Sequence, residues 1–150
     1  VKDQITLYDT KISDANVKKA AELTGLAETI EALPDKYDTL CTPDLFSQGQ
    51  WQLLSIARAA VSRAPILILD EATSALDNES EILVGQSLEK LAHGRTTLTI
   101  AHRLTTIKDY DRILVLGEEG IVESGTHDQL LAKQGVYYRL WNQLPGEDTL

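Results

Sequence analysis

The sequence predicts an α/β fold with a mainly helical first part. Two short segments, Ile66–Leu69 and Thr96–Ile100, have the composition of strands, and a helical pattern lies between them. Ile66–Leu69 is apolar without polar alternation, which is typical of a strand buried on both faces in a parallel sheet. A strand, a helix and a second strand in this order indicate an α/β unit.

Helical patterns cover most of the chain before the first strand. Asp14 can cap a helix whose apolar residues recur through Val17–Leu23 and that closes at Gly25. A shorter helix is expected around Ala27–Leu33. The stretch Ile5–Tyr8 is ambiguous and could be a strand.

A longer helix is expected to begin at Ser47 and to carry a broad apolar face as far as Val61. Asn78 and Glu81 have the spacing of a capping box, which predicts the start of the helix between the two strands. Gly94 is expected to end that helix.

The last part of the chain predicts two more strands, Ile113–Leu116 and Ile121–Val122, joined by a glycine-rich turn. Thr126 and Gln129 form a second predicted capping box, which opens a helix. A final helix is expected after Gly135.

Composition excludes several classes of protein. The chain has 150 residues, 43% of them hydrophobic, which is enough for one packed domain. Its net charge of −9 argues against a surface that binds nucleic acid. The single cysteine, Cys41, cannot form an internal disulfide, and no apolar run approaches the ~20 residues that cross a bilayer. No signal peptide is recognisable, and the absence of methionine predicts a fragment of a longer protein.

Three polar residues follow the predicted parallel strands. Asp70 and Glu71 come directly after the first strand, and His102 follows the second. Ligand sites of open α/β sheets lie at the carboxyl ends of strands, where Asp70 could hold Mg²⁺ and Glu71 could accept a proton from water. The alternatives are two acids in a solvated loop and a surface histidine.

The segment Ser47-Gln48-Gly49-Gln50 leads directly into the longer helix. Ser47 and Gln50 have the spacing of a capping box, which is a structural explanation of the motif. The same geometry could bind an anion, because the first N–H groups of a helix have no partner within it and Gly49 would remove a side chain from the approach.

In order and spacing these motifs resemble the nucleotide-binding domain of ABC (ATP-binding cassette) transporters. The resemblance runs from about Ile5 to Trp141, and its exporter-type character rests on the segments at 30–39 and 121–131. The matching motifs are the signature motif (Phe46–Gln50), the Walker B strand (Ile66–Asp70), the catalytic glutamate (Glu71), the D-loop (Ser74–Asp77) and the switch histidine (His102).

The resemblance implies a partial P-loop NTPase (RecA-like) core with part of the ABC helical subdomain. Residues 1–62 would belong to the helical subdomain with the signature helix, and residues 63–150 to the C-terminal part of the ATPase core. The sequence contains no Gly-Lys pair, so the P-loop is absent. The fragment alone is therefore expected to be inactive.

The resemblance also implies a role for each site residue. Ser47, Gln48, Gly49 and Gln50 would contact ATP held by a partner cassette. Asp70 would bind Mg²⁺ and help bind ATP, Glu71 would polarise the attacking water and His102 would sense the γ-phosphate. Asp77 would link the two sites of the dimer.

The implied partners are a transmembrane domain of the same transporter and a second cassette, in a homodimer or heterodimer at the cytoplasmic face of the membrane, without nucleic acid. Three residues depart from the family pattern: Phe46 replaces Leu, Gln48 replaces Gly and Trp51 stands where a basic residue is usual. Two other interpretations remain, a soluble ABC ATPase of DNA repair or translation and a non-catalytic dimerisation module.

Overall fold

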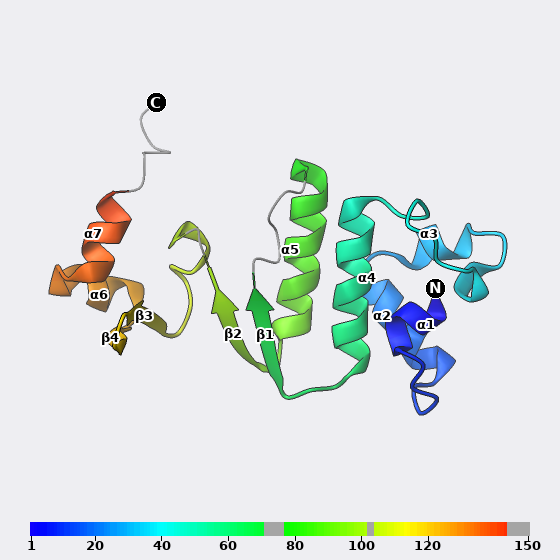
Figure 1. The fold of residues 1–150 in the computed structure, drawn as a ribbon, viewed down its shortest axis with the longest axis horizontal. Coiled ribbons are helices and arrows are strands. Elements are labelled where there is room, and N and C mark those ends of the chain that lie inside the picture. The colour runs from blue at the N-terminus through cyan, green and yellow to red at the C-terminus, as the bar shows by residue number, and fades with distance from the viewer. Residues whose placement is uncertain (71–76, 102–103, 144–150) are drawn as a thin grey trace. The chain divides into compact units, whose positions relative to one another are not determined.

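The computed structural model describes residues 1–70, 77–101 and 104–143 (Figure 1). The chain divides into two compact units, Val1–Ile100 and Ala101–Leu150. Each unit has its own cluster of buried hydrophobic side chains. The boundary predicted after residue 62 separates two subdomains of the family and stays a prediction.

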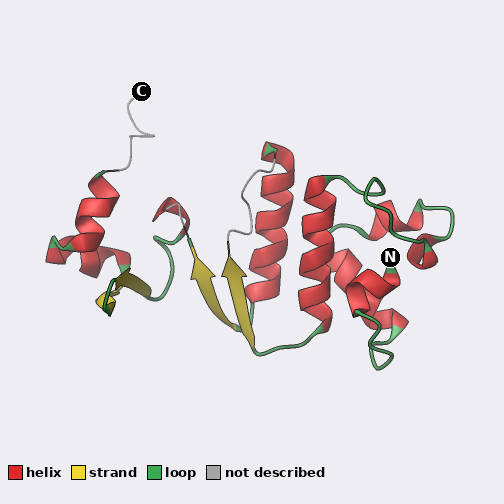
Figure 2. Cartoon of the chain, in the orientation of Figure 1, coloured by secondary structure: helices red, strands yellow, loops and turns green. Residues whose placement is uncertain are grey.

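Helices dominate the first unit, as the secondary-structure colours of Figure 2 show. Its elements are α1 (Lys2–Thr6), α2 (Asp14–Leu23), α3 (Ala27–Glu31), the 3-10 helix η1 (Lys36–Asp38), α4 (Gln48–Val61), β1 (Ile66–Asp70), α5 (Asn78–Ala92) and β2 (Thr96–Ile100). The second unit contains the 3-10 helix η2 (Leu104–Thr106), β3 (Ile113–Gly117), β4 (Gly120–Gly125), α6 (His127–Lys133) and α7 (Val136–Asn142).

Helix α4 is the centre of the first unit. It packs against α1, α2 and α5, and α4 and α5 lie side by side (Figure 1). Leu54 of α4 is buried in one cluster with Val17 of α2 and Val84 of α5. Two arginines add polar contacts: Arg58 Nε donates to the Gln4 carbonyl at 2.8 Å, and Arg95 Nη1 donates to the Ala59 carbonyl at 3.2 Å.

Strands β1 and β2 pair in parallel, which confirms the predicted α/β unit. Leu67 and Leu69 of β1 pack into the cluster that includes α5. The prediction that this strand is buried on both faces is wrong within the described chain, because Ile66 and Ile68 are 60% and 64% exposed. Side chains alternate along a strand, and the described helices cover only the face that carries Leu67 and Leu69.

Two predicted helix caps are corrected by one residue each. Ser13, not Asp14, caps α2, and its side chain accepts the Asn16 N–H. Asp77, not Asn78, caps α5. In both cases the preceding residue has extended backbone and a side chain that reaches the third residue of the helix. The ambiguous Ile5–Tyr8 begins in helix α1 and is not a strand.

The second unit consists of an antiparallel hairpin, β3 and β4, with α6 packed against β4 and α7 packed against α6. The predicted capping box of Thr126 and Gln129 is confirmed. Glu123 accepts the N–H groups of Val136 and Tyr137 at 2.7 and 2.9 Å, and so satisfies two of the first N–H groups of α7.

None of the helices within the described ranges has the length and hydropathy of a membrane span.

Candidate functional site

The candidate site is built around the start of α4. Ser47 has extended backbone and caps the helix, and its Oγ accepts the Gln50 N–H at 3.2 Å. Gln50 Oε1 in turn accepts the Ser47 N–H at 2.9 Å. This complete capping box confirms the structural explanation of the Ser47–Gln50 spacing, and it fixes both side chains at the helix start.

Phe46 and Trp51, two departures from the family pattern, lie against each other. Their rings meet edge to face with centroids 5.4 Å apart, and Phe46 is buried. They occupy the positions before the cap and four residues into the helix, which is the arrangement of a hydrophobic staple. Trp51 Nε1 also donates to the Pro43 carbonyl at 3.2 Å, so the pair holds the loop that enters α4.

Gly49 lies in the first turn of α4 and is buried. A Cβ at this position would lie 2.4 Å from Ser80 Oγ and 2.6 Å from Ser80 Cβ. Ser80, a residue of the same chain, therefore leaves room only for a glycine at position 49. An anion bound by the motif would be a second neighbour. Ser80 is not among the residues that the sequence motifs single out.

Asp77 caps α5 and is held by Ser80 through both carboxylate oxygens. Oδ1 accepts the Ser80 N–H and Oδ2 accepts the Ser80 hydroxyl, each at 2.9 Å. Hydrogen bonds to the charged form, first from the Ser80 N–H and then from its hydroxyl, lower the pKa of the Asp77 carboxyl below its usual value. Ser80 thus joins the starts of α4 and α5. The Asp-x-x-Ser spacing is the signal that could have found it.

Asp70 is the last residue of β1, and it is paired with Ile100, the last residue of β2. The two parallel strands therefore end on the same edge, with the exposed Asp70 carboxylate on it. Asp70 takes no part in the contacts between α4 and α5 described above. Glu71, the D-loop residues before Asp77, and His102 lie outside the described residues, so their roles stay predictions.

No group of three or more His, Cys, Asp or Glu side chains able to hold a metal ion occurs within residues 1–70, 77–101 and 104–143.

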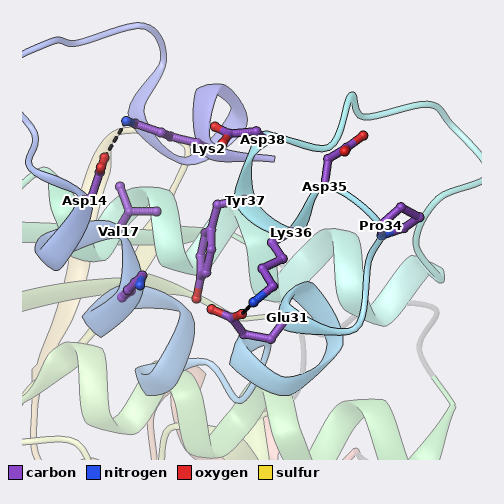
Figure 3. Close-up of a pocket in the computed structure, with 10 residues that line it drawn as sticks. Lys2, Asp14, Val17, Glu31, Pro34, Asp35, Lys36, Tyr37 and Asp38 are labelled. Carbon is purple, nitrogen blue, oxygen red and sulfur yellow. Dashed lines mark ion pairs between the residues drawn. The ribbon is translucent and has the colours of Figure 1, made fainter.

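A pocket of about 460 Å³ lies between α1, α2, α3 and η1 (Figure 3). Four of its charged side chains form two ion pairs, Lys2 with Asp14 and Lys36 with Glu31, the second at 3.0 Å. Burial and the nearby Glu31 carboxylate raise the pKa of the Tyr37 phenol. None of the predicted site residues lines this pocket.

Comparisons with known proteins agree with the motifs. A family model described as "ABC transporter" matches residues 1–74. An ATP-dependent lipid A-core flippase of Chromohalobacter salexigens is 48% identical over 93% of this chain and 26% of its own length, and one of Bordetella pertussis is 50% identical over 91% and 22%. The chain thus spans about a quarter of the length of these relatives.

A solved structure, of a bacterial Atm1-family ABC exporter with ATP bound, matches 99% of this chain and 26% of its own length. The TM-score is 0.81 and the sequence identity is 38%. The predicted fold class, an α/β part of such a nucleotide-binding domain, is confirmed.

Proposed function

Because this chain belongs to the ABC transporter family, we propose that it forms part of an ATP-hydrolysing cassette that couples ATP binding and hydrolysis to transport across a membrane. The observation that carries the proposal is the parallel pairing of β1 with β2. It ends both strands on one sheet edge, and Glu71 and His102 follow these two strand ends in the sequence. Ligands of α/β sheets bind at such an edge.

The start of α4 is proposed to contact the phosphates of ATP bound by a second cassette. Ser47 Oγ accepts the Gln50 N–H. The N–H groups of Gln48 and Gly49 are in the first turn, where backbone N–H groups have no acceptor within the helix. Such groups, together with the positive end of the helix, favour phosphate oxygens. The backbone N–H of Gln48 remains one of these groups, because the replacement of Gly by Gln changes only the side chain.

Asp70 is proposed to position Mg²⁺, because an exposed carboxylate at a strand end is a hard oxygen ligand of the kind that this ion prefers. When bound, Mg²⁺ would neutralise charge on the phosphates. Glu71 would orient and deprotonate the attacking water, and His102 would donate a hydrogen bond toward the γ-phosphate. Positioning and charge neutralisation supply most of the catalysis in phosphoryl transfer.

The proposed partners follow from the family to which the chain belongs. A second cassette would face Ser47–Gln50 and Asp77, and a transmembrane domain of the same transporter would place the dimer at the cytoplasmic face of the membrane. The present chain has no P-loop, so ATP hydrolysis requires that segment from elsewhere in the full-length protein. Turnover of ATP by the 150-residue chain alone would contradict this proposal.

The function is tested with Glu71→Gln in the full-length transporter. We expect ATP to remain bound while hydrolysis is nearly lost, because the amide cannot accept a proton from water. Glu119→Gln, in the exposed turn between β3 and β4, is the matched control and should keep the wild-type rate. Wild-type turnover in Glu71→Gln would reject Glu71 as the base.

A further inference from the structure

The starts of α4 and α5 are joined by one side chain. We propose that Ser80 is a positioning residue, which fixes Asp77 against the first turn of α4 so that the signature motif and the end of the D-loop move as one body. This inference rests on the proposed function, because both segments are proposed to meet nucleotide across the dimer of cassettes.

Gly49 and Ser80 approach each other closely. Gly49 is buried, and the space that its Cβ would need is filled by Ser80 Oγ and Cβ, 2.4 and 2.6 Å from that position. Real Cβ atoms do not approach other heavy atoms this closely, so even a methyl group at residue 49 would push α4 and α5 apart. The spacing of the two helix starts is thus set by this contact.

Ser80 is also bonded to Asp77. The Ser80 hydroxyl donates to one carboxylate oxygen of Asp77 and its backbone N–H donates to the other, both at 2.9 Å. A carboxylate with two such bonds has one orientation relative to α5. Because the same hydroxyl touches Gly49, the orientation of Asp77 and the position of α4 are linked.

Alanine and glycine at position 80 would have different effects on these contacts. Alanine at position 80 would keep the Cβ beside Gly49 and the backbone bond, but it would lose the hydroxyl together with its bond to Asp77 and its contact with Gly49. Glycine would remove the side chain that fills the space beside Gly49. The alanine variant therefore tests the hydroxyl, and the glycine variant tests the remaining Cβ contact with Gly49.

The kinetic test uses Ser80→Ala in the full-length transporter, with Ser87→Ala as the matched control. Ser87 lies on the same helix and donates to the Leu83 carbonyl at 2.8 Å, away from Asp77. We expect Ser80→Ala to lower kcat about fivefold, within the range of coupling between neighbouring groups, with KM for ATP and melting temperature like those of the control.

A Ser80→Ala variant with the kcat of the control would overturn the proposal. So would a loss of kcat that accompanies a larger fall in melting temperature than in the control, because Ser80 would then be merely structural. In either case Glu71→Gln would still trap ATP, so the proposed function would stand.

The steric test is a double-substitution cycle read by thermal melting, which does not depend on ATPase activity. We expect Gly49→Ala to lower the melting temperature of the full-length protein and Ser80→Gly, added to it, to restore most of that loss. Melting effects that simply add would overturn the proposal, because the Gly49–Ser80 contact would then not set the helix spacing.

Discussion

Helices α4 and α6 begin with the same pair of hydrogen bonds but in different surroundings. In α4, Ser47 and Gln50 exchange bonds of 2.9 and 3.2 Å. In α6, Thr126 and Gln129 exchange bonds of 3.1 and 3.4 Å. A capping box therefore identifies a helix start in this chain, and it does not by itself distinguish a ligand site.

The difference lies in what packs on the first turn. At the second helical position α4 has the buried Gly49, against Ser80, whereas α6 has the exposed Asp128. Before the cap α4 has Phe46, packed on Trp51, whereas α6 has Gly125, which has no side chain to form a staple. Tertiary packing on its first turn, rather than the capping box, therefore distinguishes the start of α4 from that of α6.

The largest effect is expected from alanine at the second helical position of each helix. Gly49→Ala should destabilise the protein by about 1–3 kcal/mol, because the added methyl overlaps Ser80. Asp128→Ala, at the same position of α6, should cost less than about 1 kcal/mol, because the position is exposed and the substitution removes only the favourable interaction of the Asp128 charge with the helix start. Thermal unfolding of both variants measures the difference, and equal losses would remove the contrast between the two helices.

The next effect is the loss of each cap. Ser47→Ala and Thr126→Ala should each cost about 1 kcal/mol of stability, because each leaves an N–H of the first turn without its acceptor. Only Ser47→Ala should also lower the ATPase rate of the full-length protein. A similar loss of ATPase rate in Thr126→Ala would contradict the assignment of the site to α4.

A smaller effect is expected from Trp51→Phe. The substitution keeps an aromatic ring against Phe46 but removes the indole donor to the Pro43 carbonyl. The expected cost is about 0.5 kcal/mol, the low end of the net value of one hydrogen bond, because this bond is exposed. Denaturant unfolding measures it, and Trp51→Ala, which also removes the staple, should cost more. Equal costs would show that the staple contributes nothing.

The smallest effect on stability near neutral pH is expected from Glu123, whose carboxylate accepts the first N–H groups of α7. The N–H groups of Tyr137 and Val136 lower the pKa of the Glu123 carboxyl. A carboxyl whose pKa is lower in the folded state stabilises the fold at pH values above its unfolded-state pKa of about 4.3. This contribution is lost as the pH falls from there through the folded-state pKa.

Glu123→Gln should therefore flatten the acid part of the stability profile, measured as unfolding against pH. Glu119→Gln, an exposed carboxyl in the adjacent turn, serves as the control. An unchanged acid profile in Glu123→Gln would show that this cap does not contribute to the pH dependence.

Local chemistry made much of the fold predictable. The β-branched and apolar runs gave the two parallel strands, and the Ser47–Gln50 and Thr126–Gln129 spacings gave two helix starts that the structure confirms. The cap of α5 was placed one residue late, because Asn78 and Asp77 are both good caps and only the backbone geometry decides between them.

The sequence by itself determined the order of the elements, the acidic residue at the end of β1 and the motifs that assign the family, because these depend on neighbours along the chain. The tertiary structure decided that Gly49 faces Ser80, that Phe46 and Trp51 form one staple, and that one face of β1 stays exposed. Gly49 and Ser80 are 31 residues apart in the sequence, and their contact depends on how α4 and α5 pack, which no local pattern encodes.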